Sequence, residues 1–391
     1  MPIGEDPETR FGPPNDFKDK YRVIETEGYQ PEGDIGEQTL KRFNLASKKS
    51  YRYLRPFLRI PYRFYSEVFH YPDKEKSWET PAIKVAEEFL GNEKVDAIIS
   101  SSSPVTCHIV ARELKNKHKI TWIADLRDLW TQNHNYPYSR FRRMIERRLE
   151  VAVLSHADAL VTVTPLWAEM LRDLHKGEEI YTITNGFDPE RLSNEETALT
   201  SKFTITYTGQ IYAGKQDPSK LLIALRDLID DGTIEAKDVE VRFYGPLDGL
   251  LAREIERYRL SDIVQQYGIV PREVSFEKQR ESQVLLHLTW EGRKGSAGYA
   301  LKLFEYLAAQ RPILATGLGN DSTKKLLDET EAGVYVKAAE DIKSILTELY
   351  SEYKRKGRVS YTGDVKKINK YSHREIARRF AEILDGQVHK R

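Results

Sequence analysis

The stretch GSAGYALKLFEYLAAQRPILATG, residues 295–317, joins a glycine-rich loop, a short helix and a buried strand. Apolar residues wrap the expected helix almost completely: Ala300, Leu301, Leu303, Phe304, Leu307 and Ala308. Lys302 and Glu305 interrupt this wrap and share one face, where we expect them to form an interior pair. Pro312 ends the helix, and Ile313 begins a buried strand. This order predicts that the start of the helix lies at the carboxyl edge of a sheet, where open α/β sheets bind ligands.

Strand-like and helical patterns alternate along the rest of the chain, which is typical of βαβ units. A length of 391 residues favours two domains of about 150 to 200 residues each. The turn Asn185-Gly186 closes the first series, and a polar stretch follows. We therefore predict an α/β fold with an amino-terminal Rossmann-like domain at 1–188 and a second at 189–365. A final helical segment at 366–391 is free to pack back across the junction.

The amino terminus is unusual for an α/β domain. Residues 1–20 are polar and rich in glycine and proline, and the first strand-like run is Tyr21 to Thr26. Such a domain normally opens on a buried strand. Whether an opening β-α unit is missing therefore stays open.

Charge and cysteine content exclude several classes of protein. The 61 basic and 60 acidic residues nearly cancel, so no overall field recruits nucleic acid. Cys107 is the single cysteine, which rules out an internal disulfide and favours a small core residue. No apolar run approaches the roughly 20 residues of a membrane span, and no signal peptide is evident. We expect a soluble cytoplasmic enzyme.

One segment is strongly asymmetric in charge. Residues 41–65 contain eight basic and no acidic residues, interleaved with tyrosine and phenylalanine. This composition favours peripheral contact with an anionic membrane on its inner face, or a lipid-phosphate acceptor; RNA is disfavoured because no RNA-binding motif accompanies it. A second basic run at 139–148 extends the pattern, and solvated helix faces stay open as the alternative.

Two strand ends place a hydroxyl residue before a proline. Ser103 precedes Pro104, and Thr164 precedes Pro165. We predict that both hydroxyl residues are helix N-caps with proline at the first helical position. Either helix start can also hold an anion, an alternative that the sequence leaves open.

Three motifs together resemble a known family. They are NGFDPE at 185–190, YTGQIYAGK at 207–215 and KLFEYLAAQRPILA at 302–315. In this order and spacing the chain resembles the GT-B glycosyltransferases, and more narrowly the retaining, nucleotide-sugar-dependent family 4, from about Val95 onward. DLRDLW at 125–130 further resembles a subgroup of cell-surface polysaccharide and glycolipid assembly. The resemblance implies two Rossmann-like domains facing across a cleft, a hexosyltransferase without metal or cofactor, and a UDP- or GDP-linked sugar as donor.

The resemblance also implies how the donor is held. Glu305 matches the last carboxylate of an E-x7-E motif that binds the donor ribose, and a carboxylate can accept from two neighbouring hydroxyls. Ala297 stands where the family often has its first glutamate, so the sugar-contacting carboxylate is missing. Glycine backbone from Gly295 onward can still approach the donor closely.

The leaving nucleoside diphosphate needs positive charge. Lys215, after Gly209 and Gln210, matches the family's phosphate-binding lysine, although Gln210 replaces a frequent arginine. Lys302 is an alternative phosphate ligand. Two further candidates are Arg293 and Lys294. A purely surface role for Lys215 stays open.

The first domain provides the acceptor side according to the resemblance. Asp125, Arg127 and Asp128 follow the strand-like run ITWIA and are our catalytic candidates. An aspartate there can orient the incoming hydroxyl, and Arg127 can hold an acceptor phosphate. A structural pairing of Arg127 with either aspartate is the alternative. Asn185 and Gly186 are expected to form the hinge that closes the cleft.

Two other functions remain possible at this point. Gly317-x-Gly319-x-x-Ser322 imitates a dinucleotide fingerprint, which would indicate an NAD-dependent oxidoreductase. A non-catalytic GT-B-like partner protein that binds nucleotide sugars is favoured by Ala297 and the unusual amino terminus.

Overall fold

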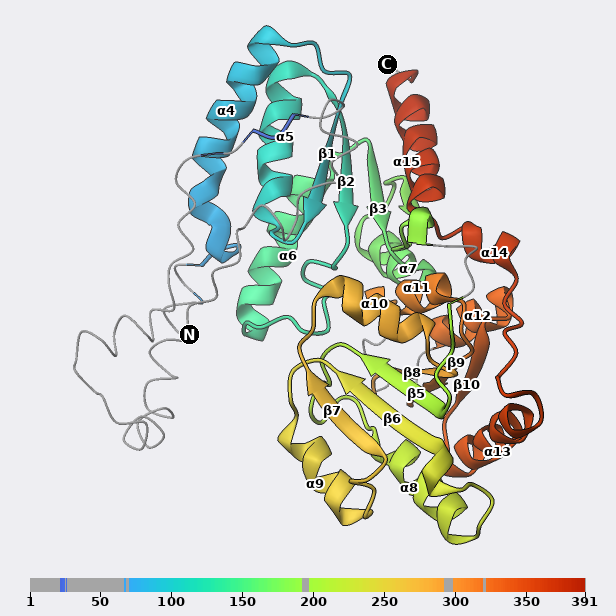
Figure 1. Ribbon diagram of the computed structural model, residues 1–391. Helices are drawn as coiled ribbons and strands as arrows, with labels where there is room; N and C mark the ends of the chain where they lie inside the picture. The colour runs from blue at the N-terminus through green and yellow to red at the C-terminus, as the bar shows by residue number, and fades with distance from the viewer. Residues whose placement is uncertain are drawn as a thin grey trace.

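The computed structural model describes residues 22–24, 26, 67, 70–191, 197–291, 298–318 and 321–390. Figure 1 shows two α/β domains, with the last helix of the chain returning to the first domain. The predicted α/β class with parallel sheets is confirmed. The basic and aromatic segment 41–65 lies outside the described residues.

The amino-terminal domain is built on a four-stranded parallel sheet in the order β1-β2-β3-β4. Its strands are β1 (Ala97–Ser102), β2 (Thr121–Leu126), β3 (Ala159–Thr162) and β4 (Ile180–Thr182). In the register, Ala97 pairs with Thr121 and Ile123 with Ala159. Every residue of β2 and β3 is buried, because helices cover both faces of the sheet.

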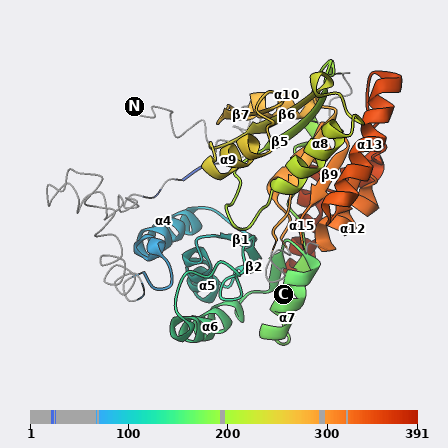
Figure 2. The same cartoon turned by 90° about the horizontal axis from the view of Figure 1, so that it is seen from below.

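Alternate residues of β2 face different helices. Trp122 and Leu126 pack with helices from the middle of the domain, whereas Ile123 packs against the carboxyl-terminal helix. The helices of this part are α4 (Glu79–Asn92), after the short η2 (Lys74–Trp78), α5 (Thr106–His118), α6 (Arg140–Leu154), α7 (Pro165–Leu174) and α15 (His373–Val388). The side chains of α15 on the sheet are Ile376, Phe380, Ile383 and Leu384. Thus α15 covers the second face of the first sheet (Figures 1 and 2).

One of the two predicted N-caps is confirmed. The hydroxyl of Thr164 accepts from the backbone N–H of Trp167 at 3.2 Å. The prediction for Ser103 is wrong, because α5 begins only at Thr106. Asp73 caps this helix instead, accepting from the N–H of Thr106 at 2.9 Å and from its hydroxyl at 2.6 Å. A residue 33 positions away thus replaces the local cap.

The second domain is built on a six-stranded parallel sheet in the order β10-β9-β8-β5-β6-β7. Its strands are β5 (Phe203–Thr208), β6 (Val239–Tyr244), β7 (Val264–Gly268), β8 (Val284–Leu288), β9 (Ile313–Thr316) and β10 (Gly333–Val336). The chain moves outward from β5 to β7 and then returns to the other side of β5 at β8. The topological switch point therefore lies between β5 and β8, where doubly wound sheets bind ligands.

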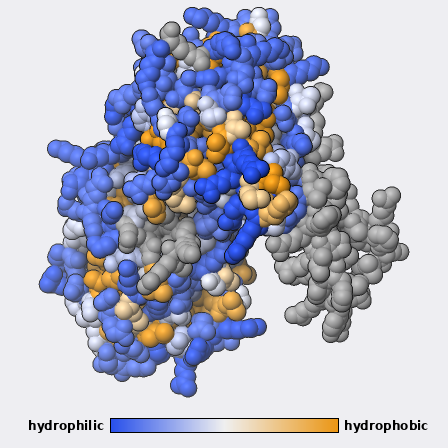
Figure 3. Space-filling model, turned by 180° about the vertical axis from the view of Figure 1, so that it is seen from behind, coloured by the Kyte–Doolittle hydropathy of each residue, from blue (hydrophilic) through white to orange (hydrophobic). Residues whose placement is uncertain are grey.

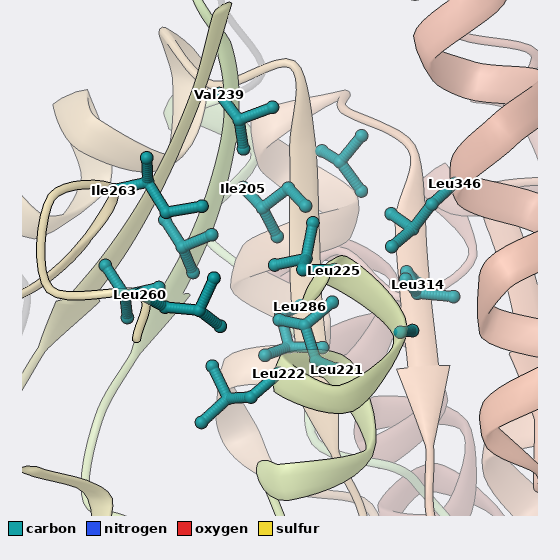
Figure 4. Packing of buried hydrophobic residues seen from close by; sticks show 14 of the residues in the cluster. Ile205, Leu221, Leu222, Leu225, Val239, Leu260, Ile263, Leu286, Leu314 and Leu346 are labelled. Atoms are coloured by element: carbon teal, nitrogen blue, oxygen red, sulfur yellow. The ribbon is translucent and has the colours of Figure 1, made fainter. Parts of the chain in front are cut away.

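Helices cover both faces of this sheet as well. They are α8 (Ser219–Asp230), α9 (Gly249–Arg257), α10 (Arg272–Arg280), α11 (Leu301–Ala309), α12 (Asp321–Thr330) and α13 (Ala339–Lys356), with α14 (Val365–Asn369), η3 (Pro189–Arg191) and η4 (Ala236–Asp238) as short elements. Figure 4 shows Ile205 and Leu286 of the sheet packed with Leu225 of α8 and Leu346 of α13. The helix and strand predicted on either side of Pro312 are found as α11 and β9.

No helix of the described residues is long and apolar enough to cross a bilayer. Seen from behind, the surface is largely hydrophilic, with hydrophobic residues in separate patches on both domains (Figure 3). These patches are smaller than the buried cores of the two domains, where the apolar residues of the strands and helices gather.

Two segments that cross between the domains pair through their backbones. The N–H of Phe187 donates to the carbonyl of Tyr371 at 3.1 Å, and the N–H of His373 donates to the carbonyl of Phe187 at 2.8 Å. Asn185 and Gly186, the predicted hinge, lie in the first segment. A Cβ on Gly186 would lie 2.2 Å from the carbonyl oxygen of Tyr371. Only glycine therefore fits between the two crossings.

We predict that Gly186→Ala destabilises the protein by about 1–3 kcal/mol, because the added methyl group must displace backbone atoms of the second crossing. Gly91→Ala is the matched control, since no atom lies within 4 Å of a Cβ at this position near the end of α4. It should be neutral or slightly stabilising. Calorimetric unfolding of both variants tests this, and equal melting temperatures would contradict the close approach.

Candidate functional site

Four strands of the second sheet end at, or directly before, a glycine with positive φ. Gly209, Gly245 and Gly317 follow β5, β6 and β9, with φ of 105°, 148° and 146°, and Gly268, with φ of 80°, is the last residue of β7. A Cβ on Gly245 would lie 2.3 Å from the carbonyl oxygen of Gly209, and one on Gly317 would lie 2.1 Å from Oγ1 of Thr289. Gly317 is buried, and Gly245 and Gly268 are half-buried, so of these four glycines Gly209 is the one that exposes its backbone at the carboxyl edge, where a ligand can approach closely.

Lys302 of α11 lies at the end of β5. Its Nζ donates to the hydroxyl of Tyr207 at 2.7 Å and lies 4.0 Å from the centroid of that ring. The Tyr207 hydroxyl in turn donates to the carbonyl of Gln210 at 2.8 Å. Burial lowers the pKa of Lys302 to about 7, while the charge of Glu305 acts in the opposite direction. This ammonium therefore titrates near neutral pH.

The prediction that Lys302 and Glu305 pair with each other is wrong, because each side chain has a different partner. Oε1 of Glu305 accepts from Nη2 of Arg272 at 3.1 Å, and the Glu305 side chain is 28% exposed. Arg272 begins α10, which follows the carboxyl end of β7. No local pattern predicts Arg272 as the partner of Glu305, since it lies 33 positions away along the chain. Glu305 is consequently an accessible carboxylate at the same edge of the sheet.

Lys215 lies in the loop after β5 and reaches the first domain. Its Nζ donates to Oδ1 of Asn135 at 2.9 Å and lies 4.3 Å from the ring centroid of Trp290. The ring of His134 meets Trp290 edge-on, with centroids 4.8 Å apart. Burial and, to a lesser extent, Lys215 lower the pKa of His134. The loops that follow β2 and β5 therefore touch at the domain junction.

Trp290 and Glu291 follow β8, on the other side of the switch point, and sequence reasoning missed both. The N–H of Glu291 donates to the carbonyl of Lys215 at 2.7 Å, which joins the loops after β5 and β8. Its carboxylate accepts from Lys220 at 2.7 Å. The signal was available, because an aromatic and an acidic residue come directly after the apolar run VLLHL.

Asp125 and Asp128 occupy different environments at the end of β2. Asp125 is buried, and its Oδ2 accepts from Nε of Arg127 at 2.7 Å and from the hydroxyl of Ser101 at 2.9 Å. Asp128 is exposed, and no other described residue hydrogen-bonds or ion-pairs with its carboxylate. Partial desolvation raises its pKa above the usual range. Of the two aspartates, Asp128 is the one available to a ligand.

Arg127 links three parts of the fold. Beyond its pair with Asp125, its Nη1 donates to Oδ1 of Asn185 at 3.3 Å and to the carbonyl oxygens of residues 183 and 184 at 3.3 and 3.2 Å. Its guanidinium carbon lies 5.5 Å from the ring centroid of Phe380 on α15. The alternative that Arg127 pairs with an aspartate in a structural role thus agrees with its observed contacts.

Part of the predicted donor site lies outside the described residues: Arg293, Lys294, Gly295 and Ala297. The chain resumes at Gly298, where a Cβ would lie 3.1 Å from the Trp167 ring of α7. The end of the glycine-rich loop therefore lies at the domain junction. Within the described part of the chain, no group of three His, Cys, Asp or Glu side chains is placed to hold a metal ion.

We predict that Arg127→Gln destabilises the protein by about 3 kcal/mol, because it leaves the buried carboxylate of Asp125 without its charged partner. Asp128→Asn should change stability by no more than about 0.5 kcal/mol, since its carboxylate has no described partner. Thermal and urea unfolding of the two variants measure this difference. Equal losses of stability would show that Arg127 does not hold the junction.

Comparison with known proteins agrees with the fold. Residues 46–191 match the model of Glycosyltransferase Family 4. No curated protein matches the chain in sequence. The match covers the first domain, whereas two of the three sequence motifs lie in the second.

Several solved structures are similar over both domains. Sucrose-phosphate synthase from Thermosynechococcus elongatus has a TM-score of 0.58 at 14% identity, covering 81% of this chain and 80% of that one. HepE from Anabaena in complex with UDP has a TM-score of 0.60 at 14% identity, with 79% and 82% covered. The lipopolysaccharide outer core galactosyltransferase WaaB has a TM-score of 0.54 at 12% identity, with 79% and 80% covered.

Likeness at such low identity concerns the fold. The solved structures show the GT-B fold, and the family model matches residues of the first domain. The resemblance that the sequence motifs suggested is confirmed: the chain has the GT-B fold, and its residues 46–191 match Glycosyltransferase Family 4.

Proposed function

We propose that this protein is a retaining hexosyltransferase that moves a hexosyl group from a nucleotide-diphosphate sugar to a hydroxyl of a glycan or glycolipid acceptor. One observation carries the proposal. At the switch point of the second sheet, two lysines flank glycine backbone, and the loop there touches the loop after β2 of the first sheet, which carries Asp128. The nucleotide sugar is the substrate, and no cofactor or metal ion is part of the proposal.

The lysines suit the diphosphate of the donor. Lys215 is exposed, whereas Lys302 is half-buried beside Gly209 with its ammonium partly desolvated, so the two cations differ in their access to solvent. The bond between the sugar and the diphosphate breaks with negative charge developing on the leaving group, which preorganised cations stabilise. HepE, a structural neighbour, was solved with UDP and with UDP-glucose, which supports a UDP-linked sugar as donor.

Glu305 suits the ribose of the donor nucleotide. Its carboxylate is accessible, and Arg272 contacts Oε1 alone, which leaves Oε2 for a hydroxyl. Arg272, at the start of the neighbouring helix, also orients the carboxylate through its contact with Oε1. The missing glutamate at position 297 means that the contacts to the sugar itself must come from other groups.

On the acceptor side, we assign the contact with the incoming hydroxyl to Asp128. Asp125 and Arg127 are engaged with each other and with the crossing segment, so they position the edge loop and do not meet the acceptor. The acceptor oxygen bonds to the anomeric carbon as the bond from that carbon to the diphosphate oxygen breaks; the departing nucleoside diphosphate takes the electron pair, and its oxygen accepts the hydroxyl proton. Asp128 can orient the hydroxyl for this step.

The dinucleotide-binding alternative has less support from the fold. Gly317 follows β9, which lies between β10 and β8, so the fingerprint-like stretch is not at the switch point beside β5. A non-catalytic partner would keep the donor site and lack turnover. A role in cell-surface polysaccharide synthesis and a cytoplasmic location stay predictions from the sequence.

We predict that UDP- or GDP-linked hexoses raise the melting temperature, and that the preferred donor releases free nucleoside diphosphate when an acceptor is added. Glu305→Gln should weaken nucleotide binding roughly 10- to 100-fold, because it removes a charge-assisted hydrogen bond to the ribose. Isothermal titration with UDP and GDP measures this change. Glu273→Gln, at an exposed position in the first turn of α10, should bind the nucleotide as the wild type does.

The outcomes separate the alternatives. Binding without release of nucleoside diphosphate across a panel of glycan and lipid-linked acceptors would favour a non-catalytic partner. Unchanged nucleotide binding in Glu305→Gln, with turnover intact, would remove Glu305 from the ribose site. Hydride transfer with NADH would replace the proposal altogether.

We also predict a pH dependence of nucleotide binding that comes from Lys302. Its pKa is about 7 in the free protein, and a bound diphosphate favours the charged form. Binding at pH 8 should therefore take up a proton, and the affinity should fall by up to about tenfold per pH unit above pH 7. Titration calorimetry in two buffers of different ionisation enthalpy measures the proton uptake.

Lys302→Gln provides the control for this measurement. The nucleotide's own phosphate titrates near pH 6 and is common to both proteins, so only the contribution of Lys302 is lost. The variant should bind more weakly at pH 7 and show little proton uptake at pH 8. Equal proton uptake in the two proteins would mean that Lys302 does not meet the phosphates.

A further inference from the structure

The outward face of α6 carries hydrophobic side chains that the proposed transfer reaction does not use. Phe141, Met144 and Ile145 are 69%, 52% and 40% exposed. Their spacing of i, i+3 and i+4 places them in one strip along the helix. The helix lies on the outside of the amino-terminal domain (Figures 1 and 2). Three large apolar side chains are thus gathered on one exposed strip.

The charges of α6 are sorted by face. Its exposed charged residues are all arginines: Arg140, Arg143, Arg147 and Arg148. Its two acidic residues, Glu146 and Glu150, are buried and already bound. Glu146 pairs with Arg142 and accepts from Tyr136, and Glu150 accepts from Thr131. The outward face of the helix therefore presents four positive charges and no negative charge.

The arginines border the hydrophobic strip. Arg140, Arg143 and Arg147 recur at i, i+3 and i+7 along one side of it, and Arg148 lies within the strip. Arg143 also stacks on Tyr136, with 4.6 Å from its guanidinium carbon to the ring centroid. The other three arginines are not engaged in ion pairs with described residues.

An open hollow of about 470 Å³ continues this surface toward the end of α7. It is lined by Met144, Arg147, Arg148, Val151, Ala152 and Leu174. Two arginines and four apolar residues thus line the same hollow. A guanidinium matches the geometry of a phosphate group, and the apolar lining matches hydrocarbon.

We propose that the outward face of α6 docks this protein on a bilayer that contains anionic phospholipids. A free phosphate would use the arginines and leave the hydrophobic strip in water, whereas a bilayer satisfies both at once. Phe141, Met144 and Ile145 enter the boundary between headgroups and acyl chains, and the arginines bind lipid phosphates. Charge complementarity between the acid-free face and anionic lipid selects this partner.

Docking through α6 would also place the acceptor side of the proposed site close to the membrane. The helix begins directly after the loop that contains Asp128, His134 and Asn135, which touches the donor loop at Lys215. Docking would hold this loop near the membrane surface, within reach of a lipid-linked acceptor. Membrane binding itself needs neither donor nor turnover, so it stands or fails independently of the proposed function.

The test is sedimentation of the full chain with vesicles of phosphatidylcholine alone or mixed with phosphatidylglycerol. We expect binding to the anionic vesicles that weakens with salt. The triple variant Arg140→Gln, Arg147→Gln, Arg148→Gln should lower the partition coefficient by about 100-fold, at about fivefold for each charge. The double variant Phe141→Ser, Met144→Ser should also weaken binding, because it removes the apolar part of the surface.

The variants Arg253→Gln and Arg257→Gln on α9 are the matched control. Both arginines are exposed, but α9 also exposes Glu256, so its face carries both signs of charge. This double variant should bind vesicles as the wild type does. Melting temperature and nucleotide binding should stay unchanged in all variants, because none of these residues contacts the donor site.

Three outcomes would overturn the proposal. The first is no preference of the wild type for anionic vesicles. The second is undiminished binding of the triple variant, which would assign any membrane contact to another part of the chain. The third is a dimer in solution that the Phe141→Ser, Met144→Ser variant dissolves, which would assign the face to a second copy of this chain.

Discussion

The backbone pairing between Phe187 and the segment around Tyr371 is the constraint on which the architecture depends. It holds the two chain crossings side by side, with Gly186 at the point of closest approach. From there α15 runs back over the first sheet and buries Ile123 and Val161. The amino-terminal sheet therefore obtains its second hydrophobic layer from the end of the chain, so the two domains cannot be completed separately.

Arg127 connects the crossing segments to the carboxyl edge of the first sheet. It touches the crossing at Asn185, the returning helix at Phe380 and the buried carboxylate of Asp125. A buried carboxylate is costly unless it is paired, so Asp125 needs Arg127, and Arg127 is oriented by the crossing. The next residue, Asp128, is left without a described partner on a loop that this network holds in place. The Arg127–Asp125 pair thus fixes the loop, and the carboxylate of Asp128 on this loop is held in position for a ligand.

Patterns of adjacent residues predicted helices, strands and one cap correctly, but they did not predict side-chain contacts between residues far apart in the sequence. The apolar wrap before Pro312 predicted α11 and β9, and Thr164 before Pro165 predicted a cap, because each depends on a few adjacent residues. The cap from Asp73, the Arg272 partner of Glu305 and the Asn135 partner of Lys215 come from residues 33, 33 and 80 positions away. Nothing in a helical or strand period encodes such distant pairs. Ser103 is not a cap because α5 begins only at Thr106, where the distant Asp73 binds the first backbone N–H.

The donor edge of the second sheet and the outward face of α6 differ in which charges are buried. At the donor edge, Lys302 contacts no acidic side chain among the described residues and lies against Tyr207, so burial disfavours its charge and a bound anion would favour it. On α6 the reverse holds, because both acids are buried with partners, one of them with the buried Arg142, while the other four arginines remain in solvent. A chain with nearly equal numbers of basic and acidic residues can therefore present strongly positive surfaces. These positive surfaces cannot be inferred from the net charge, because they depend on which charged side chains the fold buries.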